Sequence, residues 1–517
     1  MATLGERLAA SLSLLERLQK EGRHVFRSGE FTRVHRERLV RNGFLREVMK
    51  GWLISSRPES DSGDTTFWYA SFWEFCGAYC TSRFHQDWCL SPDQSLLLHA
   101  ENTVIPQQVI IHTPKGTNNS VHLLFGTSLY DLTQKRMPPA ADITEHEGLR
   151  LFAPEAALTR VPESFFARHP VEAQVVLSEI RDATTFLARL LAGGHPPIAA
   201  RRAGDFRRVG RADVADEIVR TMKIAGYDLR ESVPFNTAHS FGSLGRRSAP
   251  VVGRLQAMWE RSREPVINAF PRPPGLPGDP QAYLRHVDEI YGSDAYHSLS
   301  IEGYRVTPQM IERVRTGNWD PDNRESDRQN RDALAARGYW QAFRLVRETV
   351  AEIIAGGDPG SLVQGVHSDW YRELFQPSVA VGLIPASALA GYRNDAVYLR
   401  GSRHVPPRWQ AVRDAMPTLF ELLKQETEPA VRAVLGHWLF GYIHPYPDGN
   451  GRMARFVMNA MLASGGYPWT VIRLEDRNAY LSALEAASVD QEIGVFARFM
   501  AERVQGSQEQ NNRPDQC

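Results

Sequence analysis

The sequence predicts a multidomain chain with a predominantly α-helical C-terminal half and an N-terminal half that mixes helices and strands. Its 517 residues, 42% hydrophobic and 23% charged, are an ordinary globular composition with room for about three domains. A Pro- and Gly-rich stretch at 271–280 is typical of a linker. Helical periodicity also flanks a polar loop near residue 444. We expect domains at 1–57, 58–240 and 281–505, a linker at 241–280 and a disordered tail at 506–517.

Residues 1–57 are predicted to form a small domain of helices and paired strands. Leucines recur at helical spacing in the first segment, at Leu4, Leu8, Leu12 and Leu15. A helix from about Phe31 to Val40 precedes an Asn42-Gly43 turn and a strand pair over 44–53. This order of helix, turn and wing resembles a winged helix.

Residues 23–50 are strongly basic, with eight Lys or Arg against three Glu, a local charge of 8 − 3 = +5. Together with the segment Leu90–His99 and a strand from Val109, the first 235 residues or so resemble the transcriptional-regulator antitoxins of abortive-infection type IV systems. That resemblance implies contact with DNA, for which the candidates are Arg33, Arg36, Arg41 and Lys50. The alternative is a solvated face of a protein-binding domain.

A buried helix is predicted to deliver His444 to the end of a loop. The apolar residues Val431, Leu435, Leu439 and Tyr442 recur at helical spacing. Pro445 and Pro447 then stop the helix. Helical spacing resumes from Arg452, so Asp448-Gly449-Asn450-Gly451 opens a second helix. The free amides and the positive end of that helix dipole predict a phosphate site.

Each part of this loop alone is more often structural than functional, but the parts occur together. The run from His444 to Arg455 matches His-Pro-Phe-x-Asp/Glu-Gly-Asn-Gly-Arg-x-x-Arg except that Tyr446 replaces Phe. On this motif the chain is identified as a member of the Fic family over about residues 280–500. The segment Gly391–Pro407 resembles the β-hairpin flap that docks a target, through Val397, Tyr398 and Leu399.

The Fic resemblance implies transfer of AMP from ATP to a Ser, Thr or Tyr hydroxyl of a protein. His444 would be the general base, and Asp448 would hold Mg²⁺. The residues that would bind the nucleotide are Gly449, Asn450, Gly451, Arg452, Arg455 and Tyr480. Doc-type toxins, which transfer phosphate instead, typically carry Ala and Lys at the positions of Gly449 and Gly451.

A second motif, Ser298-x-x-x-Glu302-Gly303, resembles the inhibitory motif that some Fic proteins carry before the catalytic core. Glu302 would pair with Arg455 and keep ATP out of its productive pose. Resting activity is then expected to be low, and removal of AMP as a second activity stays open. The alternative is that Ser298 and Glu302 are an i, i+4 pair on a solvated helix face.

The formal net charge of +0 excludes a bulk attraction to nucleic acid or membrane, so only local patches count. No apolar run reaches the roughly 18 residues of a membrane span, so we expect a cytoplasmic protein, with a homodimer left open. The competing hypothesis is a DNA-binding, toxin-antitoxin-like regulator that uses the Fic fold only as a nucleotide sensor. His444 favours an enzyme, because a sensor has no use for a base.

Overall fold

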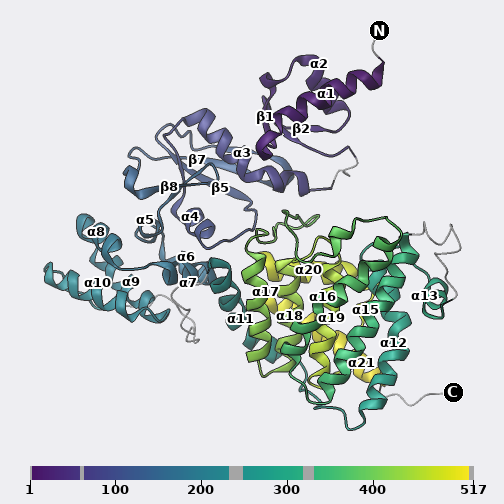
Figure 1. The fold of residues 1–517 in the computed structure, drawn as a ribbon. Helices are drawn as coiled ribbons and strands as arrows, with labels where there is room; N and C mark the ends of the chain where they lie inside the picture. Colours follow the sequence, from purple (N-terminus) through teal and green to yellow (C-terminus); the bar gives the residue numbers. More distant parts are fainter. Residues whose placement is uncertain (1–2, 59–62, 232–248, 318–330, 512–517) are drawn as a thin grey trace. The chain divides into compact units, whose positions relative to one another are not determined.

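The computed structural model describes residues 3–58, 63–231, 249–317 and 331–511, which are mostly helical with three small sheets (Figure 1). The chain divides into two compact units: Met1–Pro250 with Tyr398–Val405, and Val251–Val397 with Pro406–Cys517. The predicted fold class is confirmed in its main lines, a mostly helical C-terminal part preceded by α+β structure.

The first unit opens with two helices and a three-stranded antiparallel sheet of order β1-β3-β2. The elements are α1 (Leu4–Leu18), β1 (Val25–Arg27), α2 (Arg33–Arg41), β2 (Leu45–Met49) and β3 (Trp52–Ser55). The predicted helix, turn and strand pair are therefore present. A single 3-10 turn (Ser28–Glu30) precedes α2 where a winged helix would have a further helix, and the winged-helix resemblance stays a prediction.

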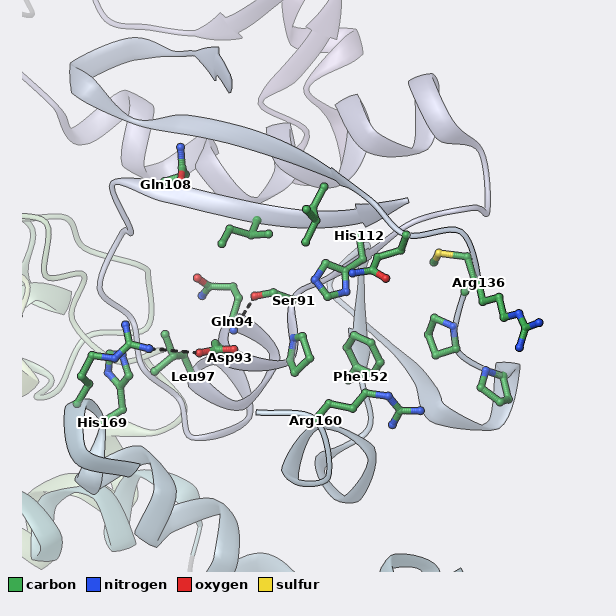
Figure 2. Close-up of a pocket in the computed structure, with 18 residues that line it drawn as sticks. Ser91, Asp93, Gln94, Leu97, Gln108, His112, Arg136, Phe152, Arg160 and His169 are labelled. Carbon is green, nitrogen blue, oxygen red and sulfur yellow. Dashed lines mark hydrogen bonds and ion pairs between the residues drawn. The ribbon is translucent and has the colours of Figure 1, made fainter. Parts of the chain in front are cut away.

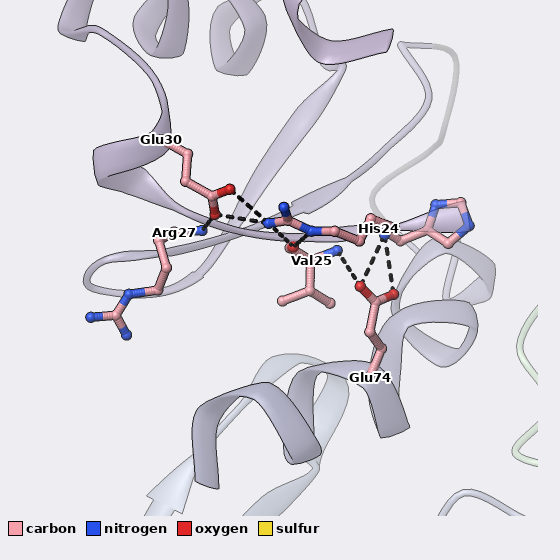
Figure 3. A network of polar contacts seen from close by, with 6 residues as sticks. His24, Val25, Arg27, Glu30 and Glu74 are labelled. Atoms are coloured by element: carbon pink, nitrogen blue, oxygen red, sulfur yellow. Dashed lines mark hydrogen bonds and ion pairs between the residues drawn. The ribbon is translucent and has the colours of Figure 1, made fainter. Parts of the chain in front are cut away.

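Strand β1 is an edge strand, so its outer backbone groups need partners from outside the sheet. Glu74 of α3 (Thr66–Phe84) supplies them by accepting the N–H groups of His24 at 3.1 Å and Val25 at 3.0 Å (Figure 3). Arg23 ties the same strand to Glu30 at 2.7 Å. These contacts hold the small N-terminal sheet against α3.

The middle of the first unit contains a mixed sheet of order β4-β5-β7-β6, in which β5 and β7 run parallel. Its strands are β4 (Cys89–Leu90), β5 (Gln108–Thr113), β6 (Ser120–His122) and β7 (Ser128–Thr133), and a separate hairpin is formed by β8 (Ile143–His146) and β9 (Leu149–Phe152). Val109 and Ile111 of β5 are buried in the same core as α3. By alternation, Gln108, Ile110 and His112 lie on the opposite face.

The rest of the first unit is helical and packs around one apolar core. The helices are α4 (Pro92–His99), α5 (Pro154–Leu158), α6 (Glu163–Arg168), α7 (Pro170–Glu179), α8 (Thr184–Gly193), α9 (Pro196–Arg208) and α10 (Ala212–Ile224). Helix α4 begins beside the sheet, with Ser91 as its N-cap. Its position creates one wall of a cavity described below.

The second unit is a bundle of helices (Figure 1). They are α11 (Pro250–Ala269), α12 (Pro280–Ile301), α13 (Pro308–Arg315), α15 (Arg331–Ile354), α16 (Pro359–Ala380), α17 (Val412–Gln425), α18 (Pro429–Ile443), α19 (Asn450–Ala463), α20 (Arg477–Val489) and α21 (Ile493–Asn511). Helices α18 and α19 are buried along almost their whole length, so the loop that joins them is rigidly supported at both ends.

Two predicted boundaries need correction. Helix α11 occupies half of the predicted 241–280 linker, because Val251, Leu255 and Met258 bury an apolar stripe that the neighbouring prolines obscured. The boundary at 240/241 lies outside the described residues. Helix α21 extends to Asn511, so the first part of the predicted tail is helical, and residues 512–517 lie outside the described part. None of the described helices combines the length and apolar character needed to cross a bilayer.

Candidate active site

His444 lies where the sequence predicted, at the C-terminal end of α18. It caps the helix in the left-handed conformation, with φ 51°, and its N–H donates to the carbonyl of Phe440 at 3.0 Å. This conformation is uncommon for a residue with a Cβ, and such residues are frequent at functional sites. The turn points the chain into Pro445 and ends the helix there.

The imidazole of His444 is suited to act as a neutral base. Its Nδ1 lies 3.3 Å from the carbonyl of Gly441, which assigns the proton to Nδ1 and leaves Nε2 as the acceptor. Burial, against the hydrogen bond to Gly441 and with a smaller contribution from Arg393, lowers the pKa of His444 to about 4. The ring is therefore uncharged at neutral pH.

The loop after His444 is closed by the side chain of Asn450. Its Oδ1 accepts the N–H of Tyr446 at 2.9 Å, and its Nδ2 donates to the carbonyl of Tyr446 at 2.8 Å. Tyr446, which replaces the usual Phe, is fully buried and stacks on Tyr371 with ring centroids 3.8 Å apart. The side-chain amide of Asn450 is thus used to shape the loop. Only the backbone N–H of Asn450 is then available for the predicted contact with the nucleotide.

The N-terminus of α19 provides the predicted anion cradle. Gly449 is the N-cap, with φ 80°, a conformation that favours glycine, and a Cβ there would lie 2.8 Å from Phe375. The first amides of a helix have no intrahelical acceptor, so those from Asn450 to Arg452 are available to phosphate oxygens.

Asp448 fits the metal role predicted for it. Its Oδ1 accepts the N–H of Gly449 at 2.6 Å, but its side chain is 65% exposed and Arg452 approaches only to 3.6 Å. The described residues contain no cluster of three metal-ligating side chains. One accessible carboxylate beside an anion cradle suits Mg²⁺, which takes most of its remaining ligands from water and substrate phosphates.

Two buried arginines follow on the first turns of α19. Arg452, 1% exposed, lies between the rings of Tyr304 at 5.2 Å and Phe375 at 5.0 Å. Arg455, 3% exposed, donates through Nε to the Ser298 hydroxyl at 2.9 Å and through Nη2 to the Ser298 carbonyl at 3.1 Å. Both cations are fixed before any nucleotide arrives, which reduces the cost of binding phosphate.

The carboxylate of Glu302 lies on this cradle. Its Oε1 accepts from Nη2 of Arg455 at 2.7 Å, and a Cβ on Gly451 would lie only 2.2 Å from the same oxygen. Burial would raise the pKa of Glu302, but Arg455 and Arg452 outweigh it, so the pKa is lowered and the group is ionised at neutral pH. The predicted pair is present, and the alternative of a solvated helix face is wrong for Ser298, which is buried.

Gly303 explains how Glu302 is positioned. Helix α12 ends with the N–H of Gly303 bonded to the carbonyl of Ser300 at 3.0 Å and the N–H of Tyr304 bonded to that of Leu299 at 3.1 Å. This is the Schellman arrangement, which needs a left-handed residue, and Gly303 has φ 87°. Arg477 also donates to the carbonyl of Ile301 at 3.0 Å, which fixes the helix end beside the loop.

Tyr480, which was predicted to bind the nucleotide, lies in the protein interior. It is buried, and its hydroxyl lies 2.7 Å from Nε2 of His437. Burial raises the pKa of Tyr480 to about 12. It therefore lines the protein interior near Arg455, and its hydroxyl is already used by His437.

The predicted β-hairpin flap is wrong in its secondary structure. A turn closes from Leu399 to Ser402 at 3.2 Å with Gly401 at φ 77°, but the described residues around it form no strand. The reason is that backbone groups are used elsewhere: within the first unit, Gly401 N–H donates to Thr65 Oγ1 at 3.1 Å and Ile105 N–H to the Arg403 carbonyl at 2.8 Å. Val397, Tyr398 and Leu399 are half-buried.

Arg393 is a site residue that the motif did not reveal. It is buried and donates through Nε to the carbonyl of His444 at 2.8 Å, while its own N–H donates to the carbonyl of Pro445 at 2.9 Å. It therefore braces the backbone of the base from outside the motif. The sequence pointed to Arg393 only through its position in the segment Gly391–Pro407, which was predicted to form the flap.

The basic residues of the N-terminal domain lie mainly on α2 and after it. Arg33, Arg41 and Lys50 are exposed and Arg36 is half-buried. Arg33 is paired with Glu37 at 2.7 Å. Val34 and Val40 are exposed on the same helix, at 60% and 41%. A mixed basic and apolar surface suits either DNA or a protein partner, so DNA binding stays a prediction.

Comparison with known proteins agrees with this geometry. Residues 361–462, which hold the loop from His444 to Arg455, match the Fic/DOC family. The second unit therefore contains a Fic domain.

Among curated proteins, the chain is similar to the protein adenylyltransferase Fic of Nematostella vectensis, 31% identical over 264 residues, which are 50% of this chain and 56% of that protein. It is 25% identical to the protein adenylyltransferase Fic of Culex quinquefasciatus over 326 residues, 61% of this chain and 58% of that protein. The chain thus spans a little over half the length of these two relatives.

Among solved structures, Fic-1 from C. elegans is 16% identical with a TM-score of 0.37, covering 69% of this chain and 90% of that one. A Fic domain containing signaling protein from Bacteroides thetaiotaomicron is 18% identical with a TM-score of 0.33, covering 50% of this chain and 93% of that one. The assignment of the domain rests on the sequence matches.

Proposed function

We propose that this chain is a protein adenylyltransferase that transfers AMP from ATP to a Ser, Thr or Tyr hydroxyl of a protein. The observation that carries the proposal is a neutral imidazole, His444, at the end of one buried helix beside the anion-binding N-terminus of the next. The names of the curated relatives support the same activity.

In the proposed reaction the hydroxyl oxygen attacks the α-phosphate and pyrophosphate leaves. Nε2 of His444 takes the hydroxyl proton, because Nδ1 is held by Gly441. The α19 amides and Arg452 stabilise the charge on the phosphates. Asp448 would hold Mg²⁺, which when bound neutralises charge on the nucleotide. The chain's own residues position and neutralise the reactants, as in phosphoryl transfer generally.

We also propose that Glu302 keeps the resting enzyme inactive. Arg455 is taken by Glu302 and Ser298, and the Glu302 oxygen lies where an incoming phosphate would approach Gly451. An ATP molecule that cannot reach Arg455 has no fixed γ-phosphate, so its α-phosphate is not held in line with the hydroxyl. The Glu302–Arg455 distance of 2.7 Å is that of a charge-assisted hydrogen bond.

Peptide mass spectrometry tests the activity directly. The Glu302→Gly chain is incubated with ATP and Mg²⁺, alone and with a cell lysate, and peptides are searched for an adenylyl adduct on Ser, Thr or Tyr. We expect adducts that disappear when Mg²⁺ is withheld. A phosphate adduct would indicate a phosphotransferase, and no adduct on any protein would favour the nucleotide-sensor hypothesis. AMP removal, the second activity that the sequence left open, needs Glu302 and is tested separately, by adding the parent chain to a preformed adduct and measuring its loss.

For the N-terminal domain we propose contact with duplex DNA through α2 and the residues after it, supported by the exposed Arg41 and Lys50 and the half-buried Arg36. This contact is independent of the AMP-transfer proposal.

A further inference from the structure

A cavity of about 810 Å³ lies entirely within the first unit (Figure 2). Its walls are the start of α4, the outward face of β5, the end of β7, Gln134, residues 136–139 and the junction of α6 with α7. Its volume falls within the roughly 300–1,000 Å³ typical of pockets for small molecules. Nothing in the proposed AMP-transfer reaction uses this cavity.

Two polar side chains in the cavity, those of Gln94 and His112, make no hydrogen bond to the described residues. Gln94 is only 8% exposed, yet no hydrogen bond to its side-chain amide is present in the described part of the chain. Figure 2 shows this amide beside Ser91, whose hydroxyl caps α4 by accepting the N–H of Gln94 at 3.2 Å. The ring of His112 likewise makes no hydrogen bond within those residues. An amide that lines a cavity without a protein partner is available to a ligand or to water.

The charges around the cavity favour an anion. Three arginines line it, Arg136, Arg160 and Arg168, against one carboxylate, Asp93. Arg160 is engaged by Asp142 at 2.7 Å, and Arg168 lies 3.8 Å from Asp93. Arg136 is exposed, and no ion pair holds it within the described residues. The N-terminus of α4 adds the positive end of a helix dipole.

The remaining wall is apolar. Ile110 of β5 is 37% exposed beside Leu132 of β7. Phe152 lies beneath this wall, 2% exposed, with the guanidinium of Arg160 over its ring at 5.2 Å and the ring of His112 6.0 Å away. Figure 2 shows Gln94 and His112 near the middle of the view, Arg160 below Phe152 and Arg136 at the right.

We propose that this cavity is a second nucleotide site, which binds a heterocycle against Ile110 and Leu132 and its phosphate near Arg136. Gln94 and His112 provide both donors and acceptors for the edge of a base, since burial lowers the pKa of His112 and favours its neutral ring. Arginine and the α4 N-terminus recognise phosphate. Asp93 can accept from a ribose hydroxyl or an exocyclic amine.

The same chemistry is offered by a free nucleotide and by the 5′-phosphorylated end of a nucleic acid. Both carry a base, a sugar and a terminal phosphate. The two sources are separated by competition, with a free nucleoside monophosphate in one arm and a 5′-phosphorylated oligonucleotide in the other.

Photo-crosslinking of the full chain tests the proposal. The probe is 8-azido-AMP, and adducts are mapped by peptide mass spectrometry, so labelling here is read separately from labelling at the Fic loop. We expect adducts in the peptides that contain residues 91–99, 108–113 or 132–139. Arg136→Glu should reduce these adducts about tenfold, because one charge-assisted phosphate contact is lost and a repulsion is added. Arg136 is exposed, so this variant keeps the fold.

Lys135→Glu is the matched control, since Lys135 is exposed, makes the same charge change and does not line the cavity. It should leave the adducts unchanged, and Gln94→Leu should weaken them by loss of the amide. Competition by AMP or by the oligonucleotide identifies the source. Adducts confined to peptides around residues 444–455, equal labelling of Arg136→Glu and parent, or failure of both competitors would overturn the proposal, whatever the outcome for AMP transfer.

Discussion

At the scale of single residues, the proposed role of His444 as the base follows from where its backbone places it. The left-handed cap, the bond to Gly441 and the brace from Arg393 leave Nε2 as the available acceptor. None of these features requires bound nucleotide, so the base is prepared before substrate arrives.

His444→Ala should abolish AMP transfer in a Glu302→Gly background while ATP binding is kept, because only the base is lost. A general base contributes about 10²–10⁴ in rate. Incorporation of labelled AMP measures the first quantity, and equilibrium dialysis with ATP measures the second. Transfer at an unchanged rate would remove His444 from the mechanism, and lost binding would mean that the ring shapes the cradle.

The pH dependence of kcat/KM reports the pKa of the catalytic base in the free enzyme. Because the pKa of His444 lies at about 4, below its ordinary 6.5, the ring is neutral above about pH 5. In the Glu302→Gly variant the acidic limb should fall at or below pH 4, since Glu302 raises that pKa in the parent. The same depressed pKa adds stability that is present above pH 6.5 and is lost as pH falls toward 4. An acidic limb near 6.5 would contradict a buried, neutral base.

At the scale of elements, the C-terminal end of α12 fixes the position of Glu302. The helix must stop at Ile301, and Gly303 in the left-handed conformation makes it stop there. A change at Gly303 therefore acts on Glu302 without touching the carboxylate.

Gly303→Ala should raise AMP transfer partly, below the level of Glu302→Gly. A Cβ at φ 87° costs roughly 1 kcal/mol, which would shift the helix end and weaken the Glu302–Arg455 pair by up to about fivefold in population. Gly292→Ala, a helical glycine with open space around its Cβ, is the matched control. Unchanged transfer by Gly303→Ala would mean that the carboxylate is held independently of the helix end.

Helix α2 carries the DNA prediction. Arg36→Glu with Arg41→Glu should lower the affinity for duplex DNA and flatten its dependence on salt. Binding releases fewer counterions when fewer phosphates are contacted. Arg17→Glu on α1 makes half of that charge change at an exposed arginine and should have little effect, and each single variant, Arg36→Glu or Arg41→Glu, is compared with it. Gel shifts across a salt series measure both. No DNA binding by the parent chain would contradict the winged-helix interpretation.

At the scale of the whole molecule, the parts predictable from sequence were those determined by near neighbours. His444, the anion cradle and the Ser298–Glu302–Gly303 helix end depend on local spacing, and the structure brings them together. The parts missed depend on distant partners. Arg393 braces His444 from 51 positions away, and the flap forms no strands because its backbone bonds go to Thr65 and Ile105. Local alternation of Val397 and Leu399 could not reveal either.

The central claim is that this chain transfers AMP and that Glu302 suppresses the transfer by holding Arg455. Labelled-ATP incorporation by the parent and by Glu302→Gly, measured side by side, tests it most directly. If the pair biases the equilibrium by about 1.5–3 kcal/mol, as hydrogen bonds to charged groups do, the variant should incorporate roughly 10- to 150-fold more label. Equal incorporation by the two chains would contradict the claim, because the contact between Glu302 and Arg455 would then have no effect on activity.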